Sequence, residues 1–356
     1  MLKNLSTAVR MSWARSKQTD SLPFGQQLKE MLMLQLMTGF GPGNYHKYRL
    51  WQKDMPWQQK LGYWHDQKYY RFLNQVNPLE YRMLARNKIV AKSLLSFYSI
   101  PDAQYLGYLS GSGRFIPNGS VPDCARDLTS ILRSYPDIER ICFKPVEGSG
   151  GDGFCAADVI RGDDISLREL GEHKSLSVDA FIERTLTPYT GCDFIIEVYL
   201  EQHPTLAAFN PSSLNTLRVW VGKDQGSEAS VIAVYLRVGR AGSLVDNRLS
   251  GGFGIAIDQN NFKTTIAVPQ DSSGPSFKHH PDSGYDMSER QLPFQKEVIA
   301  LAKKVTNVLP STRFVGLDIA LTPDGPVIIE FNLAPTAIGA CVMNRSHQQL
   351  LGTLVH

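Results

Sequence analysis

Apolar positions in the first part of the chain follow a helical period. Residues 2–13 carry an apolar side chain at every third or fourth position, and residues 1–86 are rich in Trp, Tyr, Gln and Met with few β-branched residues. Turns rich in Gly or Pro, at 39–43 and 77–78, divide this region into segments. The pattern predicts a mainly helical N-terminal region, residues 1–86.

The pattern changes at residue 87, where short runs of β-type residues alternate with helices. Lys88–Tyr98 is predicted to be a short helix that ends before Pro101. Residues 123–134 are predicted to form a second helix, with Asp123 as its N-cap. The strands predicted in this stretch are 104–109, 141–146 and 154–160.

Strands dominate the pattern from residue 194 onward. The predicted strands are 195–200, 216–221, 230–238, 255–258, 314–321 and 327–331. One long helix, 288–308, interrupts them, and Ser288 and Gln291 at its start have the spacing of a capping box. Helices and strands mixed in this order predict an α+β protein rather than a regular βαβ array. We expect three parts: a helical N-terminal region (1–86), a first α+β lobe (87–194) and a second α+β lobe (195–356).

Charge is distributed unevenly along the chain. The 356 residues hold 37 Lys and Arg against 34 Asp and Glu, and the net charge of only +3 argues against a nucleic-acid-binding protein. Residues 1–100 alone carry a net charge of +10, from 15 basic and 5 acidic residues, whereas the remainder carries −7. We therefore expect an anionic partner to dock on the basic part, with Lys47, Arg49 and Lys53 as contacts.

The first 17 residues have two interpretations. They contain Lys3, Arg10, Arg15 and Lys17 and no acidic residue, on an amphipathic pattern. Such a segment is typical of an ordinary opening helix, which we favour, and also of a targeting or membrane-surface helix.

Cysteine usage and hydropathy limit the class of protein. The five cysteines are an odd number with no CxxC spacing, which fits neither a disulfide framework nor a zinc site. A reducing compartment is favoured, so we expect the protein in the cytoplasm. No apolar run approaches the roughly 18 residues that a membrane span needs.

An acidic hairpin is predicted at residues 314–332, FVGLDIALTPDGPVIIEFN. Pro, Asp and Gly at 323–325 predict a three-residue loop. In that register Asp318 lies opposite Glu330, with Asn332 farther along the same face. Two adjacent carboxylates repel each other unless a cation lies between them, and such oxygen ligands favour Mg²⁺ or Mn²⁺. The alternative is a solvated acidic face without a metal.

A glycine-rich loop follows a strand at residues 143–154, FKPVEGSGGDGF. The strand delivers Lys144, and the four glycines allow backbone N–H groups to approach phosphate oxygens. An ordinary hairpin with a Lys at the sheet edge is the alternative. Beside the acidic hairpin, however, a Lys and a glycine-rich loop complete the set of groups that an ATP phosphate chain requires.

Three arginines belong to the same lobe as the acidic hairpin. Arg218 and Arg237 lie within predicted strands, and Arg248 lies in the polar turn 246–252. The planar guanidinium donates two parallel hydrogen bonds, which suits recognition of a phosphate or carboxylate. Each arginine taken alone is also compatible with a surface ion pair.

Taken together, six segments in order resemble the ATP-grasp superfamily, its α-L-glutamate ligase-like branch, and in particular the sugar-transfer-associated ATP-grasp family. They are NKIVAKSLLSFYSIP (87–101), FKPVEGSGGDGF (143–154), FIIEVYL (194–200), NTLRVWVG (215–222), DNRLSGG (246–252) and GLDIALTPDGPVIIEFN (316–332). The resemblance implies the ATP-grasp fold, in which two α+β subdomains grip ATP, here preceded by a mainly helical region.

The resemblance also implies roles for individual residues. The implied ATP-binding residues are Lys88, Lys144, Glu147, Gly148, Ser149, Gly150, Gly151, Glu197, Val198 and Leu200. Among them, Lys144 would contact the phosphates, and Glu197 with the backbone near Leu200 would bind the edge of the base. The implied catalytic residues are Arg218, Asn247 and Arg248. The implied ligands of two Mg²⁺ ions, with Mn²⁺ as an alternative, are Asp318, Glu330 and Asn332.

The activity implied by the resemblance is ATP-dependent ligation of a small-molecule carboxylate to an amine, through an acyl phosphate and with release of ADP. The substrates would belong to glycan or cell-surface polysaccharide biosynthesis, with an anionic sugar or a carrier-linked acceptor. Ser250 stands where the glutamate ligases have a basic residue, so glutamate specificity is not carried over. Two alternatives remain: a phosphotransferase that acts on a hydroxyl, and a non-catalytic nucleotide-binding module.

Overall fold

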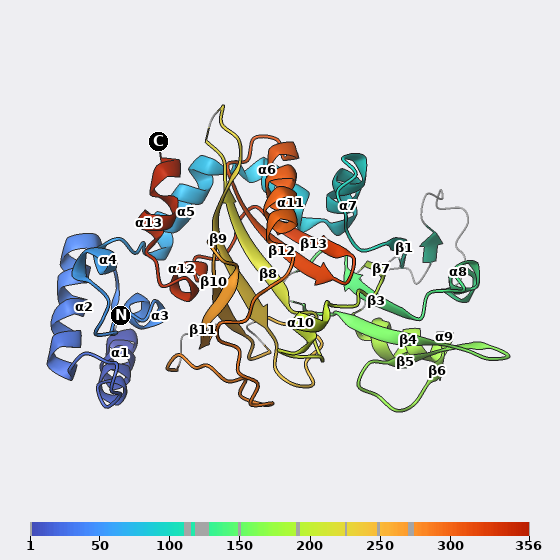
Figure 1. Ribbon diagram of the computed structural model, residues 1–356, viewed down its shortest axis with the longest axis horizontal. Coiled ribbons are helices and arrows are strands. Elements are labelled where there is room, and N and C mark those ends of the chain that lie inside the picture. Colours follow the sequence, from blue (N-terminus) through green and yellow to red (C-terminus); the bar gives the residue numbers. More distant parts are fainter. Residues whose placement is uncertain are drawn as a thin grey trace.

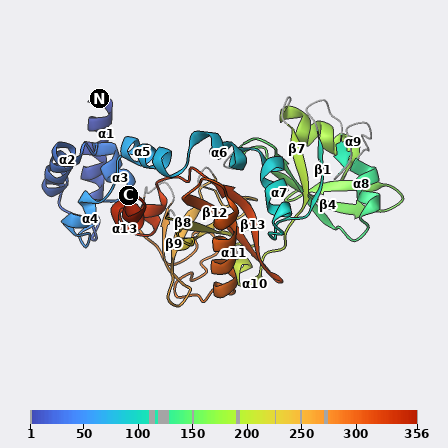
Figure 2. The ribbon, with the colours of Figure 1, turned by 90° about the horizontal axis from the view of Figure 1, so that it is seen from above.

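The computed structural model describes residues 2–109, 115–117, 128–148, 151–189, 193–224, 226–247, 250–269 and 274–355. Three parts follow one another along the long axis of the molecule: the N-terminal helices, a six-stranded sheet and a seven-stranded sheet (Figure 1). In Figure 2, α5 (Asp66–Val76), α6 (Leu79–Arg86) and α7 (Lys88–Phe97) form a bridge that runs past the six-stranded sheet to the seven-stranded one.

The N-terminal region is helical, as predicted. The helices before α5 are α1 (Leu2–Arg15), α2 (Phe24–Thr38), α3 (Pro42–Lys47) and α4 (Trp57–Leu61). Gly39 ends α2 in the left-handed conformation with φ 71°, and Pro42 occupies the first turn of α3, so the predicted turn has the residues that such geometry requires. Among the described residues, no helix combines the length and apolarity that a bilayer crossing needs.

The first sheet is antiparallel in its described pairings and follows the order β2-β1-β7-β3-β4-β5-β6. Its strands are β1 (Tyr105–Leu109), β2 (Phe115–Pro117), β3 (Arg140–Pro145), β4 (Cys155–Arg161), β5 (Ile165–Glu169), β6 (Leu176–Ser177) and β7 (Phe194–Val198). The three strands predicted here are present, whereas β2, β5 and β6 were not predicted. Because β7 pairs with β1 and β3, this sheet extends past residue 194, the expected end of the first lobe.

The second sheet is antiparallel as well, in the order β11-β10-β9-β8-β12-β13. Its strands are β8 (Thr216–Gly222), β9 (Ser230–Val238), β10 (Phe253–Asp258), β11 (Lys263–Pro269), β12 (Phe314–Thr322) and β13 (Gly325–Asn332). Two antiparallel sheets with surrounding helices confirm the predicted α+β class.

Further helices and helical turns lie between and after the strands. They are α8 (Leu128–Ser134), α9 (Val178–Phe181), α10 (Pro204–Ala207), α11 (Gln295–Val308), α12 (Gly339–Val342), α13 (His347–Leu351), the π-helical turn Ile182–Leu186 and the 3₁₀ turns Thr187–Tyr189 and Gly352–Val355. The predicted cap of α8, Asp123, lies outside the described residues.

The predicted start of the long helix at Ser288 is wrong. Helix α11 begins at Gln295, and its N-cap position makes no side-chain hydrogen bond. The Ser288 hydroxyl instead donates to Asp286 at 2.7 Å, and the Arg290 amide donates to the Thr264 hydroxyl of β11 at 2.8 Å. The segment before α11 is thus bound to a strand that the sequence pattern did not predict.

The acidic hairpin has the predicted pairing but a different loop. Thr322 pairs with Gly325, so the loop has two residues rather than three. A β-bulge between Asp318 and Ile319 then shifts the register by one residue and leaves Ile329 unpaired. Asp318 still lies opposite Glu330, because the bulge restores the alignment that the shorter loop would have lost.

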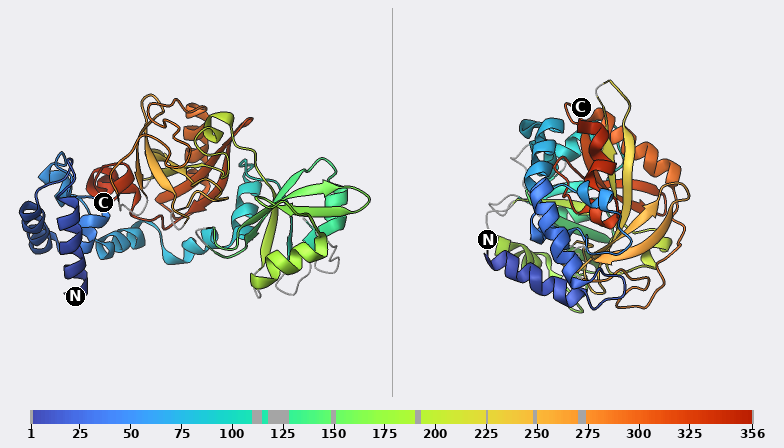
Figure 3. Two further views of the ribbon diagram at one scale, coloured as in Figure 1. Left: turned by 90° about the horizontal axis from the view of Figure 1, so that it is seen from below. Right: turned by 90° about the vertical axis from the view of Figure 1, so that its left-hand side faces the viewer.

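The N-terminal helices share one core with the C-terminal ones. Buried residues of α2, α5 and α13 belong to a single apolar cluster with Trp220 and Phe314 of the six-stranded sheet. At its centre His347 lies among Tyr48, Tyr63 and Trp64, with ring centroids 5.2, 5.7 and 5.7 Å away. The helical region therefore packs on the side of the sheet that is remote from the seven-stranded sheet (Figure 3).

Candidate active site

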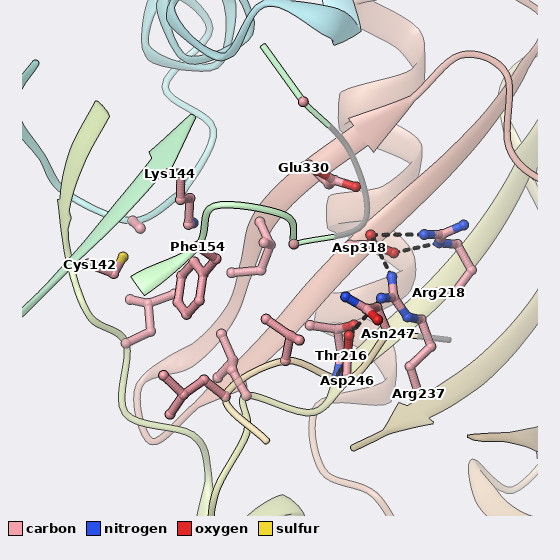
Figure 4. Close-up of a pocket in the computed structure, with 18 of the residues that line it drawn as sticks. Cys142, Lys144, Phe154, Thr216, Arg218, Arg237, Asp246, Asn247, Asp318 and Glu330 are labelled. Atoms are coloured by element: carbon pink, nitrogen blue, oxygen red, sulfur yellow. Dashed lines mark hydrogen bonds and ion pairs between the residues drawn. The ribbon is translucent and has the colours of Figure 1, made fainter. Parts of the chain in front are cut away.

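A cavity of about 390 Å³ is lined by residues from both sheets. Strand β3 contributes Cys142 and Lys144, whereas strands β8 and β12 contribute Arg218 and Asp318. In Figure 4, Lys144 lies on one side of the cavity and Asp318 with its arginines on the other. Pairing within each sheet fixes these side chains, so the relative position of the two sheets determines the shape of the site.

The acidic side of the cavity is the hairpin of β12 and β13. Asp318, Glu330 and Asn332, the three predicted metal ligands, all line the cavity. The Asn332 side-chain oxygen accepts a hydrogen bond from the Ala334 amide at 2.8 Å, which fixes the orientation of the amide group. The bulged residue Ile329 also lines the cavity.

Two arginines neutralise Asp318. Arg218, directly opposite Asp318 across the β8–β12 pair, donates from Nη2 to Oδ2 at 2.9 Å. Arg237 of β9 donates from Nη1 to the same oxygen at 2.9 Å. Burial raises the pKa of Asp318, but the two guanidiniums outweigh it and hold this pKa at about 2. Asp318 is therefore ionised throughout the physiological range.

Glu330 has the opposite environment. Burial, together with the neighbouring Asp318 carboxylate, raises its pKa above the ordinary value. Within the part of the chain that the structure describes, no Lys, Arg or His forms an ion pair with Glu330. A like-charge pair of this kind, with one member uncompensated, favours binding of a cation.

Asp246 and Thr216 extend the network behind Arg237. Arg237 donates from Nη2 to Asp246 Oδ1 at 2.6 Å, and the Thr216 amide donates to Asp246 Oδ2 at 3.0 Å. All three residues line the cavity. The predicted residue Asn247 follows Asp246 and also lines the cavity, whereas Arg248 lies outside the described residues.

On the opposite side of the cavity, a buried carboxylate holds two lysines. Glu197 Oε1 lies 2.6 Å from Lys92 Nζ, and its Oε2 lies 2.5 Å from Lys144 Nζ. Burial opposes the charge on Lys144, but Glu197 outweighs it and holds the pKa of Lys144 above the usual value. Lys144 thus stays cationic in the cavity.

Glu197, which was expected to bind the edge of the base, lies behind the wall of the cavity. It is 3% exposed and does not line the cavity, because both carboxylate oxygens are bound by lysines. Its expected contact with a base edge therefore has no support in this geometry. Val198 and Leu200, also expected at the base, do line the cavity.

Lys88 reaches the cavity from the first turn of α7. The side chain of Asn87 caps this helix by accepting hydrogen bonds from the amides of Ile89 and Val90, at 3.1 and 3.2 Å. Lys88 lines the cavity, and burial lowers its pKa. Glu147, another predicted residue, is exposed and does not line the cavity.

The glycine-rich loop lies over the Asn247 turn. Gly151 has φ 74°, and a Cβ atom there would lie 2.9 Å from Asn247 Nδ2, so only glycine fits. Gly148 and Gly151 line the cavity, whereas Ser149 and Gly150 lie outside the described residues.

Several residues of this network were not predicted from the sequence. Asp246 and Thr216 belong to the segments 246–252 and 215–222, but they were not predicted to be site residues. An acidic residue that is buried beside a strand arginine is a signal that could have identified Asp246. Lys92 lies one helical turn after Lys88, a spacing that puts both lysines on one face. The other cavity residues that were not predicted are Ala103, Cys142, Pro145, Asp152, Phe154, Tyr199, Leu214, Tyr235, Leu244, Val245, Ile329, Thr336 and Ile338.

The donor set fits a magnesium site completed by phosphates. Among the described residues there is no group of three or more His, Cys, Asp or Glu that could hold a metal. The hairpin instead offers two carboxylates and one amide oxygen, and Mg²⁺ is commonly held by one or two carboxylates together with substrate phosphates.

The fold is that of the ATP-grasp class. Residues 67–351 match the family model described as sugar-transfer associated ATP-grasp. The chain therefore belongs to the sugar-transfer associated ATP-grasp family, and residues 1–66 precede the matched segment. No curated protein sequence matches the chain.

Several solved structures are similar to this chain at low identity. An N5-carboxyaminoimidazole ribonucleotide synthetase, purK, solved as an ADP complex, has a TM-score of 0.39 and 12% identity over 74% of this chain and 53% of its own. D-alanyl-alanine synthetase A from Vibrio cholerae has a TM-score of 0.40 and 12% identity over 76% of this chain and 64% of its own. The D-alanine-D-alanine ligase from Coxiella burnetii has a TM-score of 0.42 and 10% identity over 76% of this chain and 56% of its own. The chain thus spans about half to two thirds of these proteins.

Proposed function

We propose that the protein is an ATP-dependent ligase that joins a carboxylate to an amine through an acyl phosphate and releases ADP and inorganic phosphate. The observation that carries this proposal is the division of the cavity into two sides. Lys144 is held cationic by Glu197 on one side, and Asp318 with Glu330 lies on the other. Membership of the ATP-grasp family supports the use of ATP.

The cationic side chains would bind and orient the phosphate chain. Negative charge builds up on the transferred phosphoryl group, and preorganised donors stabilise it without reorganisation. Lys88, Lys144 and Arg218 line the cavity and would supply these donors, with Asn247 beside the glycine-rich loop. The acceptor amine needs no covalent enzyme nucleophile, since it attacks the activated carboxylate directly.

Asp318, Glu330 and Asn332 would hold the Mg²⁺ ions. When bound, Mg²⁺ supplies positive charge to the phosphate oxygens. Arg218 and Arg237 keep Asp318 ionised and fixed in direction. Burial and the Asp318 carboxylate raise the pKa of Glu330, and a bound cation would favour its ionised form.

The glycine-rich loop would exclude water from the reaction. An acyl phosphate hydrolyses in water, so the site must be covered while the amine attacks. Gly148 and Gly151 line the cavity, and β3 and β4 flank the loop that contains them.

Trapping with hydroxylamine tests the proposed intermediate. The protein is incubated with ATP, Mg²⁺, hydroxylamine and a panel of uronic acids and amino acids, and ADP and hydroxamates are measured. We expect ADP release and a hydroxamate with one of the acids, and loss of both in Lys144→Met. A phosphate ester without any hydroxamate would identify a phosphotransferase and would overturn the ligase proposal.

The substrates proposed are a glycan-related carboxylate or amine, with an anionic sugar or a carrier-linked acceptor. The family's description as sugar-transfer associated supports this class. The structure does not support the three residues that were expected to contact an anionic partner, however. Arg49 is only 2% exposed, Lys47 pairs with Asp66 at 2.8 Å, and Lys53 donates to the Thr19 carbonyl. These three residues do not form a free cationic surface.

A further inference from the structure

An exposed apolar stripe lies on the outer face of α2. Leu32, Met33, Leu36 and Met37 are 61, 36, 77 and 59% exposed. Residues three and four apart are neighbours on a helix, so these side chains form one continuous patch. The opposite face of α2 is buried in the N-terminal core, which leaves the patch without a partner within the described residues. Contiguous apolar patches on a surface mark interaction sites.

The surface around this stripe is cationic. Lys29 is exposed and lies one turn before Leu32 and Met33 on the same face. The only carboxylate of α2, Glu30, is buried and paired with Lys60 at 2.7 Å. Helix α1 contains no acidic residue at all. The exposed apolar side chains of α2 thus lie beside Lys29, and Lys17 follows α1; neither lysine forms an ion pair within the described part of the chain.

Trp13 is an exposed apolar side chain of α1 that lies against the start of α2. It is 58% exposed, and its ring packs edge-on against Phe24 of α2 with the centroids 5.5 Å apart. Lys17 Nζ lies 5.4 Å from the centre of the Trp13 ring. Tryptophan and lysine side chains are common at the boundary between lipid headgroups and acyl chains.

The position of this surface leaves it accessible. Figure 1 and the left view of Figure 3 place α1 and α2 at the end of the molecule farthest from the seven-stranded sheet. Both helices precede residues 67–351, so this surface lies outside the segment that matches the family model.

We propose that the outer surface of α1 and α2 docks on an anionic lipid bilayer. The apolar stripe would enter the headgroup region, and Lys17 and Lys29 would contact the lipid phosphates. Self-association through α2 fits less well, because a two-fold symmetric contact would bring two like-charged surfaces together. The inference does not depend on the reaction proposed above.

Vesicle sedimentation tests the docking surface. The full chain is mixed with vesicles of phosphatidylcholine containing about one third phosphatidylglycerol, and with vesicles of phosphatidylcholine alone. We expect binding to the anionic vesicles, and about tenfold weaker binding in Leu36→Glu, since burial of one leucine is lost and a negative charge is added. Raising the salt should weaken binding of the parent protein.

Leu79→Glu is the matched control. It makes the same substitution at a side chain that is 65% exposed on α6, outside the proposed surface, and should bind vesicles like the parent. Binding of a non-hydrolysable ATP analogue, unchanged in both variants, verifies that they are folded. Equal binding to neutral and anionic vesicles, no binding at all, or a dimer that Leu36→Glu dissociates would each overturn the proposal.

Discussion

The cavity and the aromatic cluster around His347 differ in the charge state of their buried ionisable groups. At Asp318 and Lys144 in the cavity, and at Glu197 behind it, burial is opposed by partners of opposite charge, so these three groups remain ionised. Around His347, burial acts without such a partner and keeps the imidazole neutral, with a pKa lowered to about 3. The His347 ring instead forms neutral hydrogen bonds with the Trp64 amide and the Ala337 carbonyl, at 3.0 and 3.1 Å.

The buried groups of the two regions therefore contribute to different properties, ligand binding in one region and stability in the other. Buried charge pairs contribute little net stability, because desolvation offsets their attraction, but they keep charge available for a ligand. Neutral aromatic packing contributes stability and offers nothing to a phosphate. Changes in the cavity should therefore affect ligand binding, and changes in the aromatic cluster should affect unfolding.

The largest expected effect concerns the packed C-terminal helix. Leu351 is fully buried in the core that joins the N-terminal helices to α13. Leu351→Ala should lower the free energy of unfolding by about 3 to 5 kcal/mol, measured by denaturant titration. Leu36→Ala, at an exposed position of the same region, should change it by less than about 0.5 kcal/mol. Similar losses in the two variants would contradict the comparison.

Removal of one cavity carboxylate should have a different effect. Glu330→Gln should weaken the Mg²⁺-dependent part of ATP-analogue binding by about 100-fold, measured by calorimetry with and without Mg²⁺. The free energy of unfolding should not fall, because the change removes a like charge beside Asp318. Glu147→Gln, at an exposed carboxylate outside the cavity, is the control and should bind normally. Unaltered Mg²⁺ dependence in Glu330→Gln would refute the metal assignment.

Acid should destabilise the protein through its buried histidines. Burial lowers the pKa of His347 to about 3 and that of His46 to about 4, from 6.5 in the unfolded chain. Below pH 6.5 the unfolded state binds more protons, so stability is lost as the pH falls. Each histidine should cost about 0.8 kcal/mol between about pH 7.5 and about pH 6. Unfolding titrations of His347→Asn should give a shallower pH dependence, and an unchanged one would refute this account.

The smallest effect is expected at an exposed ion pair. Lys47 and Asp66 lie 2.8 Å apart, with side chains 34 and 55% exposed. Lys47→Met should change the free energy of unfolding by less than about 1 kcal/mol, and the effect should shrink further in high salt. A loss as large as that in Leu351→Ala would show that surface charge matters here as much as packing.

The elements of the fold followed from local patterns wherever the pattern was strong. The helices of the first 86 residues and the strands that pair Asp318 with Arg218 were predictable from period and composition. Strands β5 and β11 were not predicted, although residues 165–168 of β5 alternate between apolar and polar types. Both strands are short and follow turn-forming residues, 162–164 and 259–261. The predicted start of α11 was wrong because Ser288, a residue type typical of a helix cap, bonds to Asp286 instead, while Glu289 and Arg290 bond to Thr264 of β11.

The site was predictable as a set of motifs but not as a network. Motifs gave Asp318, Glu330 and Lys144, which carry the charges of the cavity. They did not give the partner of each charge, because Glu197 meets Lys92 and Lys144 only after β7, β3 and α7 come together. Likewise, the net charge of the first 100 residues led to the prediction that Arg49 contacts a docked partner, whereas Arg49 is buried in the folded protein.

The bulge beside Asp318 helps to decide whether Asp318 and Glu330 face each other, because that depends on whether the number of residues between them is odd or even. Here the two-residue turn and one unpaired residue together set that number. Deletion of Ile329 together with its bulge would leave the carboxylates opposite each other, whereas deletion of one loop residue with the bulge retained would turn one of them away. Grafting this hairpin onto another scaffold therefore requires the turn and the bulge to be transferred together.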